Sequence, residues 1–446
     1  MKEKKEGRGQ FTSSFGFIMA AAGGAIGLGN LWKFPYVAGA AGGGFFLLFS
    51  LVFAVLLGLP LMLAEMSIGR NTRLNAIGAF EKLGGRWKFV GVLDVLSAFL
   101  VLSYYSVVGG WVLKYVFAYA QGENLSDAAA YFDAFHTQTA APLWWHLAFM
   151  AFCVLVVAAG VAKGIELAGK WLLPLLFVLL LVVLVRSVTL PGAGEGLAFL
   201  FLPRAETFTF ESAALAMGQV LFSLSLGLGV AVTYGSYLRR DADLLRDASA
   251  VVGLDTLMAF LSGAIILPVV FSFGQPTAQG PGLLFKTLPF VFDNMPFGRW
   301  FGLVFFFLVF IAAATSAIAL LEVAAAFLID RFHWKRWAAA LAAGGVMALT
   351  GAAASLSMGP WSGLTLFGMN LFDLLGFLTD KLIIPLAAFF TSVFVGWVWG
   401  PRHAAEEIAQ GAAGFRFEKL FGFMMKWAAP ALIALVFILG FLGAPI

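Results

Sequence analysis

Apolar residues in this 446-residue chain occur in long continuous stretches that short polar segments separate. Most stretches reach about twenty residues, the length that an α-helix needs to cross the hydrocarbon core of a bilayer. They lack the strict alternation of apolar and polar positions that is typical of transmembrane β-strands. The pattern predicts eleven membrane-spanning helices, at residues 13–37, 42–69, 89–120, 143–161, 167–186, 213–237, 245–273, 299–329, 336–356, 371–399 and 424–444.

The composition supports this interpretation. Hydrophobic residues make up 61% of the chain and charged residues 12%, whereas soluble domains have about 45–50% and about 25%. A soluble core cannot absorb so much apolar side chain, so a soluble enzyme or a nucleic-acid-binding protein is excluded. No Pro- or Ser-rich linker divides the chain. We therefore expect a single domain, residues 1–446, in an all-α polytopic membrane protein.

The basic residues predict how the chain is oriented. The net charge of +4 would suggest a nucleic acid as partner for a soluble protein, but in a membrane protein Lys and Arg mark cytoplasmic loops. Lys and Arg are frequent in 70–88, 239–246 and 331–336 and absent from 121–142. With segment 1–12 in the cytoplasm, the basic loops all fall inside. The predicted C-terminus is then outside, and the lipid bilayer is an expected partner.

An internal repeat indicates a transporter. The tripeptide Gly-Leu-Gly occurs at 27–29 in the first predicted span and again at 227–229 in the sixth. Glycine is a poor helix former, and non-helical backbone is tolerated at membrane depth only where protein or a water-filled cavity satisfies it. Glycine-interrupted spans at corresponding places in two halves, here 13–186 and 213–399, predict an inverted-repeat transporter with 424–444 as an additional helix. One such span alone would favour simple close packing of helices.

The residues around the first break carry a family resemblance. The segment Gly-Leu-Gly-Asn-Leu-Trp-Lys-Phe-Pro-Tyr at 27–36 resembles the first-span signature of the neurotransmitter:sodium symporters, and 60–65, 104–105, 163–166 and 314–316 match in the same order. The resemblance is to the bacterial amino-acid transporter branch. It implies a LeuT-type five-plus-five inverted repeat with helices 1 and 6 broken. It also implies sodium-coupled amino-acid uptake by alternating access in a bacterial-type inner (plasma) membrane.

The resemblance implies two sodium sites. Sodium is a hard cation that prefers oxygen ligands, and a carboxylate at bilayer depth, which costs about 2.5–3.5 kcal/mol, needs such a partner. For Asp255, the one acid among the implied ligands, the alternative is a partly hydrated position near the cytoplasmic end of its span. For the hydroxyl groups of Thr315 and Ser316, the alternative is hydrogen bonding to their own helix. The first site comprises Ala25, Asn30, Ser223 and Asp255; the second comprises Gly23, Ile26, Ala312, Thr315 and Ser316.

The resemblance also implies a substrate pocket at the breaks, where the positive ends of half-helices suit a carboxylate. Monoamine transporters of the family have Asp at position 27, and this chain has Gly27. Together with apolar walls, Gly27 predicts a neutral, hydrophobic L-amino acid. Chloride is not expected, because Asp255 supplies a fixed negative charge. The implied pocket residues are Ala25, Leu28, Gly29, Val101, Tyr105, Phe222, Ser225, Leu228, Ser316 and Leu320.

Two ion pairs are implied as gates. The inner pair consists of Arg8 and Asp330. The outer pair involves Lys33, where many members have Arg. Position 376, where the family usually has an acid, is glycine. Asp373, one turn earlier, is the predicted partner of Lys33, and Asp380, one turn later, is the alternative.

Other functions fit the sequence less well. A proton-coupled or uncoupled transporter of the same fold is the alternative. An ion channel would need a continuous polar stripe along several spans, whereas the acids here are isolated. No nucleophile–base set indicates an enzyme. The single cysteine and four scattered histidines give no metal cluster, so no cofactor is predicted apart from Na⁺ as coupling ion.

Overall fold

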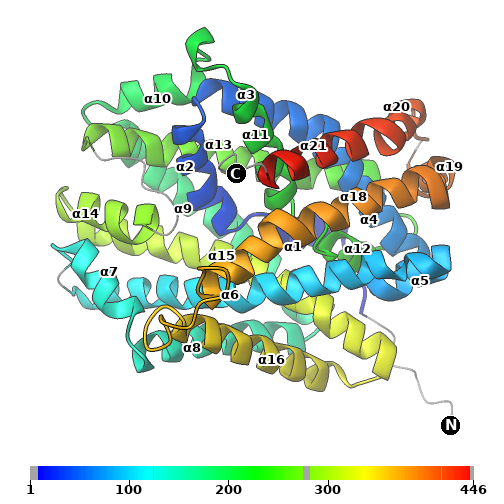
Figure 1. Cartoon of the computed structure of the whole chain (residues 1–446), viewed down its shortest axis with the longest axis horizontal. Coiled ribbons are helices and arrows are strands. Elements are labelled where there is room, and N and C mark those ends of the chain that lie inside the picture. The colour runs from blue at the N-terminus through cyan, green and yellow to red at the C-terminus, as the bar shows by residue number, and fades with distance from the viewer. Residues whose placement is uncertain (1–8, 124, 275–281, 413, 442–446) are drawn as a thin grey trace.

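The computed structural model describes residues 9–123, 125–274, 282–412 and 414–441, and helices account for most of them. The main helices run side by side along the long axis of the molecule (Figure 1). Short helices cap both ends of this bundle, with α7, α10 and α14 at one end and α5 and α19 at the other. The α-helices are α1 (Ser14–Ala25), α2 (Phe34–Ala40), α3 (Gly44–Phe53), α4 (Leu59–Thr72), α5 (Ala76–Gly84), α6 (Lys88–Gln121), α7 (Ala128–His136), α8 (Ala140–Ala158), α9 (Leu167–Val188), α10 (Ala193–Phe201), α11 (Phe210–Ser223), α12 (Val230–Gly235), α13 (Leu244–Ser272), α14 (Leu288–Asp293), α15 (Gly298–Phe332), α16 (Arg336–Leu356), α17 (Leu371–Phe377), α18 (Ile384–Val393), α19 (Pro401–Ala409), α20 (Glu418–Phe423) and α21 (Ala429–Phe441).

The predicted membrane spans are present as apolar helices. Within the described residues, nine continuous helices are long and apolar enough to cross a membrane, and one bent pair adds a tenth. Several join two of the α-helices through a π-helical turn, as Leu371–Trp399 joins α17 and α18. The predicted span 213–237 is divided into α11 and α12 and is therefore too short in each part to count. The polytopic all-α prediction is confirmed.

Both predicted helix breaks are real. The bent pair consists of Ser14–Ala25 and Gly29–Ala40, whose axes differ by 54°. The second break, residues 224–229, holds three residues with positive φ: Ser225 at 53°, Gly227 at 73° and Gly229 at 68°. A Cβ on Gly227 would lie 2.7 Å from the carbonyl oxygen of Ile384. Glycine is required there by both the backbone angle and the neighbouring chain.

The core forms around α6 and α15, the two longest helices, which pack on each other and on α8 and α16. Residues 311–326 of α15 are buried without interruption. Small residues bring the helices into close contact, since a Cβ on Gly110 of α6 would lie 2.5 Å from the backbone nitrogen of His146 in α8. Such contacts are the usual way in which helices associate in lipid, where hydrophobic burial gives little gain.

The hydrophobic pattern did not predict the short helices at the bundle ends. The helices α5, α7, α10, α14 and α19 have six to nine residues each. They lie in segments that the span pattern leaves as connections, because a search for runs of about twenty apolar residues cannot detect two helical turns. Their helical state depends on packing against the bundle ends.

One buried ion pair joins three of the segments that connect the membrane spans. Nε of Arg70, at the end of α4, lies 2.7 Å from Oε1 of Glu407 in α19, and both side chains are almost fully buried. Arg70 also donates to the carbonyl oxygens of Ala242 and Glu407, and Asn71 donates to Glu407 Oε2. The guanidinium group therefore ties the end of α4 to two other connections.

We expect Arg70→Ala to destabilise the protein by about 3–5 kcal/mol, because it leaves the carboxylate of Glu407 buried without its partner. Arg239→Ala is the matched control, since its pair with Asp241 is 60% and 67% exposed, and it should cost about 0–1 kcal/mol. Thermal unfolding of the purified variants measures both effects. Equal melting temperatures for the two variants would contradict the prediction.

Candidate sodium and substrate site

The break in the first span lies against Tyr105 of α6. The backbone N–H of Leu28 donates to the Tyr105 hydroxyl over 3.1 Å. A Cβ on Gly27 would lie 2.6 Å from Oγ of Ser316 and 2.9 Å from the same Tyr105 hydroxyl. A side chain at position 27 would therefore displace the two hydroxyl groups that face the break.

The three polar side chains of the first predicted sodium site, those of Asn30, Ser223 and Asp255, meet between three helical segments. The side-chain amide of Asn30 donates to Oδ1 of Asp255 and to Oγ of Ser223, both over 2.8 Å. Ser223 in turn donates to Oδ2 of Asp255 over 2.8 Å, and Asn30 Oδ1 accepts from the Gly27 N–H over 3.1 Å. Asp255 is 4% exposed, so the alternative of a hydrated carboxylate does not hold in this structure.

Ala25, the remaining predicted member of this first site, ends α1 and is buried. Its carbonyl oxygen lies at the helix end, where the last carbonyls of a helix lack intrahelical partners. The arrangement offers carboxylate, amide and hydroxyl oxygens at one buried point, which is the donor set that a hard cation requires.

Ser316 of α15 reaches the first span at the second predicted site. Its hydroxyl lies 3.1 Å from the carbonyl oxygen of Ile26, 3.2 Å from that of Gly24 and 3.3 Å from that of Gly23. These carbonyls belong to the last turn of α1, where the helix ends and leaves them without helical N–H partners. The geometry thus brings three backbone oxygens and one hydroxyl together across two helices.

Thr315 behaves differently. Its hydroxyl donates to the carbonyl oxygens of Ile311 and Ala312, over 3.0 and 3.1 Å, within its own helix, as the alternative interpretation expected. A Cβ on Gly23 would lie 3.1 Å from the Thr315 Cβ. Thr315 and Ala312 therefore lie beside the first span, with the Thr315 hydroxyl bonded to its own helix.

The predicted pocket residues on the sixth span surround its break. Ser225 donates to the carbonyl oxygen of Gly24 over 3.1 Å. A Cβ on Gly29 would lie 2.8 Å from the ring of Phe222, so this ring covers the first break. The remaining apolar positions are all buried, and these are Val101, Leu228 and Leu320.

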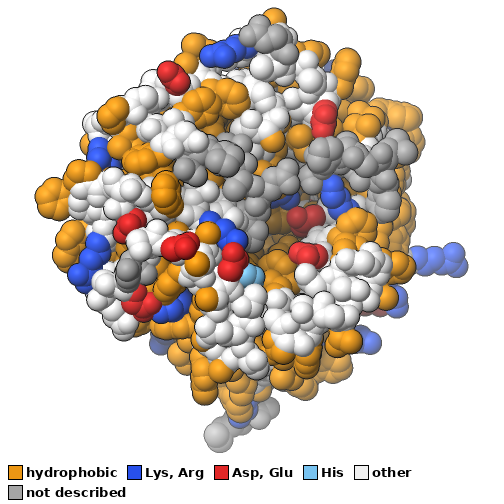
Figure 2. Space-filling view, turned by 60° about the vertical axis from the view of Figure 1, so that its left-hand side comes forward, with side chains coloured by type: hydrophobic (Ala, Val, Ile, Leu, Met, Phe, Trp, Pro, Cys, Tyr) orange, Lys and Arg blue, Asp and Glu red, His pale blue; other side chains and the backbone are white. Residues whose placement is uncertain are grey.

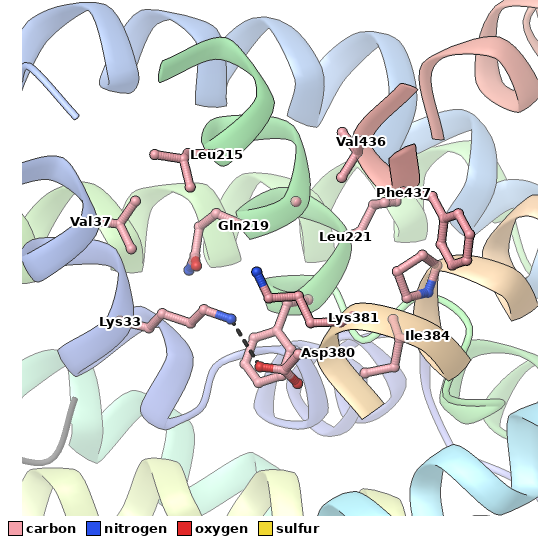
Figure 3. Close-up of a pocket in the computed structure, with 13 residues that line it drawn as sticks. Lys33, Val37, Leu215, Gln219, Leu221, Asp380, Lys381, Ile384, Val436 and Phe437 are labelled. Carbon is pink, nitrogen blue, oxygen red and sulfur yellow. Dashed lines mark hydrogen bonds and ion pairs between the residues drawn. The ribbon is translucent and has the colours of Figure 1, made fainter. Parts of the chain in front are cut away.

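The outer end of the site is closed by an ion pair. Nζ of Lys33 lies 3.1 Å from Oδ2 of Asp380 (Figure 3) and 4.3 Å from the centre of the Phe222 ring. The Tyr104 hydroxyl lies 3.5 Å from the other oxygen of Asp380. Figure 2 shows the corresponding face of the molecule, which is hollowed near its centre with acidic and basic side chains gathered around the hollow.

The predicted pairing of Lys33 with Asp373 is wrong. Asp373 lies in the first turn of α17, where its backbone N–H and carboxylate bond to Asn370. A π-helical turn, Leu378–Ile383, follows α17 and carries Asp380. Asp380 lies seven residues, or about 10 Å, further along this span than Asp373, and at that level its carboxylate faces Lys33.

A cavity of about 620 Å³, open solvent included, adjoins this pair. Lys33, Gln219, Phe222, Asp380 and Lys381 are among its lining residues (Figure 3). Gln219 Nε2 donates to the carbonyl oxygen of Gly29 over 3.1 Å and so satisfies one backbone group next to the break. The sequence motif containing Gln219 was recognised, but this function of its side chain was not predicted.

The predicted inner gate is described only in part. Arg8 lies outside the described residues. Oδ2 of Asp330, at the end of α15, accepts from the backbone and side-chain nitrogens of Asn75, over 2.7 and 2.9 Å. Asn75 also caps α5. Asp330 is therefore anchored to the start of α5 at the cytoplasmic end of the predicted topology.

These features define a class of protein. Two apolar spans are broken, buried oxygen-rich clusters lie at the breaks, and a cavity lined by the Lys33–Asp380 pair adjoins them. This combination is typical of a secondary transporter whose site lies between two repeats.

Comparisons with known proteins support this classification as a secondary transporter. The model of the Sodium:neurotransmitter symporter family matches residues 8–129 and 133–444, and the chain belongs to that family. It is 40% identical over 436 residues to the uncharacterized sodium-dependent transporter YhdH of Bacillus subtilis (strain 168), covering 96% of this chain and 97% of the relative. It is 32% identical to a sodium-dependent transporter of Methanocaldococcus jannaschii, covering 90% and 84%.

Among solved structures, the crystal structure of MhsT in complex with L-phenylalanine is similar, with a TM-score of 0.90 and 41% sequence identity over 97% of this chain and 99% of that one. The protein is a multi-pass sodium-dependent transporter of the LeuT-type fold and not an enzyme.

We expect sodium to stabilise the protein against heat relative to potassium, because a ligand that binds only the folded state adds stability. The double variant Thr315→Ala with Ser316→Ala should need roughly tenfold or more sodium for the same effect, since it removes oxygen groups worth about 1.5–3 kcal/mol. Ser262→Ala, which removes a buried hydroxyl bonded to its own helix, is the control. Equal sodium titrations of the double variant and the control would count against the second site.

Proposed function

We propose that the protein couples the sodium gradient to the uptake of a neutral, hydrophobic L-amino acid across a bacterial-type plasma membrane. Two sodium ions would bind at the clusters around Asp255 and Ser316. The two broken helices would belong to repeats 13–186 and 213–399 of one domain, which move against each other to expose the site to each side in turn. The N-terminus would lie in the cytoplasm and the C-terminus outside.

The observation that carries this proposal is the Tyr105 hydroxyl at 3.1 Å from the Leu28 N–H. This hydroxyl accepts from one N–H at the break and has its own proton left to donate. Together with the N–H groups of Leu28 and Gly29, it forms a donor set suited to a carboxylate. A sodium ion held by Asn30 and Asp255 nearby would add positive charge on the same side. A substrate that carries its own carboxylate fits this arrangement.

The pocket walls determine the class of side chain. Val101, Phe222, Leu228 and Leu320 are apolar, and Ser225 and Ser316 already donate to backbone carbonyls. A charged substrate side chain would have no partner there and would lose its hydration at a cost of several kcal/mol. The L-phenylalanine bound to MhsT, a protein of similar structure, supports a hydrophobic amino acid as substrate.

Uptake into proteoliposomes tests the proposal. Labelled leucine should accumulate with sodium outside and should not accumulate when potassium replaces sodium. Leucine, methionine, tryptophan and tyrosine should compete, whereas glutamate, lysine, tryptamine and serotonin should not, because they carry an unpaired charge or lack the carboxylate. Undiminished uptake in potassium would contradict sodium coupling and favour the proton-coupled or uncoupled alternative. Competition by tryptamine equal to that of tryptophan would contradict carboxylate recognition.

We expect uptake to continue when gluconate replaces chloride. The buried carboxylate of Asp255 already balances the charge of a sodium ion beside Asn30 and Ser223, so no second anion is needed. Asp255→Ser removes this charge and should make transport either inactive or dependent on chloride. Asp133→Asn, which neutralises a half-exposed acid outside the bundle core, is the control. A wild-type protein that stops without chloride would refute this role of Asp255.

A further inference from the structure

Two carboxylates lie behind the break in the sixth span, outside the sodium clusters. They are Glu65 of α4 and Asp94 of α6, and neither side chain has any exposed surface. Oε1 of Glu65 accepts from the backbone N–H of Gly227 over 2.8 Å. Oε2 of Glu65 and both carboxylate oxygens of Asp94 have no hydrogen-bond donor among the described residues. Three buried acidic oxygens are thus left without a partner.

Both acids contact the non-helical segment 224–229. A Cβ on Gly229 would lie 3.0 Å from the Cβ of Asp94. Ser97, one turn after Asp94, donates to the carbonyl oxygen of Gly227 over 2.7 Å. The N–H of Gly227 is therefore held from α4 by Glu65 and its carbonyl oxygen from α6 by Ser97. This segment includes Leu228, which belongs to the predicted pocket.

Within the part of the chain that the structure describes, no positively charged side chain interacts with either carboxylate. The charge that acts on Asp94 is that of Glu65, which repels it. The described part of α18 has no ionisable residue, and Tyr234 of α12 is next to Glu322. These charged groups on neighbouring elements have partners elsewhere. The basic groups pair as follows: Arg70 with Glu407, Lys82 with the Thr72 carbonyl, Lys88 with Glu81 and Lys114 with Glu123. The acidic groups pair as follows: Asp247 with Ser14, Asp255 with Asn30 and Ser223, Glu322 with Arg336 and Asp330 with Asn75.

Two negative charges cannot remain unpaired at this depth. A single buried charge without a partner costs so much that the group takes up a proton instead, and mutual repulsion adds to that cost. A hard cation needs more oxygen ligands than two carboxylates supply. A proton needs only one donor and one acceptor.

We propose that Glu65 and Asp94 form a proton-binding site beside segment 224–229, in which at least one of the two carboxyl groups keeps its proton at neutral pH. The protonated pair holds Gly227 in place between α4 and α6. Loss of the proton leaves two repelling carboxylates beside segment 224–229 and loosens it. One consequence rests on the proposed function: affinity for the amino acid should fall as this proton is lost. The protonation itself does not depend on the substrate.

Infrared spectroscopy of the purified full-length protein tests protonation directly. A protonated carboxyl group has a carbonyl stretch, separate from carboxylate bands, that shifts in deuterium oxide. The wild type should show this band at neutral pH, and both Asp94→Asn and Glu65→Gln should weaken or remove it. Asp133→Asn, which changes a half-exposed acid paired with Lys286, should retain it. Absence of the band in the wild type, or its full retention in both variants, would overturn the proposal.

Thermal unfolding without substrate gives a second test. A carboxyl group that holds its proton more tightly when folded stabilises the protein at low pH, and this stability is lost as pH rises through its folded-state pKa. Wild type and Asp133→Asn should therefore melt lower by roughly 1–2 °C for each pH unit between the unfolded-state and the folded-state pKa, and the melting temperature should level off above the folded-state pKa. Asp94→Asn should flatten this slope. Two outcomes would overturn the proton site. One is the same dependence of melting temperature on pH in Asp94→Asn as in the wild type, and the other is a wild-type dependence that disappears when sodium is added.

Failure of the proposed function would leave both of these results unchanged, because neither measurement uses an amino acid. Binding of labelled leucine at fixed sodium then tests the link to segment 224–229. Affinity in the wild type should fall by up to about tenfold per pH unit above the transition, whereas Asp94→Asn should show a smaller dependence. If binding is independent of pH while the infrared band and the stability slope behave as expected, the link to substrate is wrong.

Discussion

A helix in a membrane satisfies its own backbone, and every other feature of this protein follows from the two places where that rule is broken. At residues 26–28 and 224–229 the N–H and C=O groups need partners other than the next turn. Gln219, Ser225 and Ser316 donate to carbonyls of the first span, and Glu65 and Ser97 bind the backbone of Gly227. Two of these side chains, Ser225 and Ser316, are also predicted residues of the site. Stability and ion binding therefore share these contacts.

The buried charged groups of this protein are of three kinds, which differ in the partners that surround them. Where an acid and a base are buried together, as in Arg70–Glu407 and Arg336–Glu322, they join connections at one end of the bundle. Where an acid is buried among neutral donors, as Asp255 is, it is suited to a mobile cation. Where acids are buried with almost no donors, as Glu65 and Asp94 are, a proton is the simplest partner. The same cost of an unpaired charge in a low dielectric has three different outcomes, and the neighbouring residues decide which one applies.

The ion pair between Lys33 and Asp380, the predicted outer gate, is held by irregular turns of two helices. The pair Lys33–Asp380 lies over the ring of Phe222, and both charged residues lie in π-helical turns. Such turns have a wider backbone that leaves some bonding groups less constrained. Lys33 replaces the planar guanidinium group usual in the family with a single ammonium that holds Asp380 through one contact. This part-exposed single-contact pair is weaker than the almost fully buried pair of Arg70 and Glu407, which suits the outer gate that the family resemblance implies.

The sequence by itself determined the class of protein, because the length of apolar runs and the placement of glycine are dictated locally by the bilayer and by backbone angles. Span limits such as 336–356 agreed with the structure, and each break overlaps one of the two Gly-Leu-Gly motifs, although the second break begins three residues earlier, at Leu224. Most site residues came from the family resemblance, and the structure brought Asn30, Ser223 and Asp255 together. Only the tertiary structure decided which acid faces Lys33, because Asp373 and Asp380 are two turns apart on one side of a regular helix and only packing selects the level that meets Lys33. It also decided that Glu65 and Asp94 lie at the same segment, because two acids 29 positions apart on separate helices reach Gly227 and Gly229 only when α4 and α6 pack around segment 224–229.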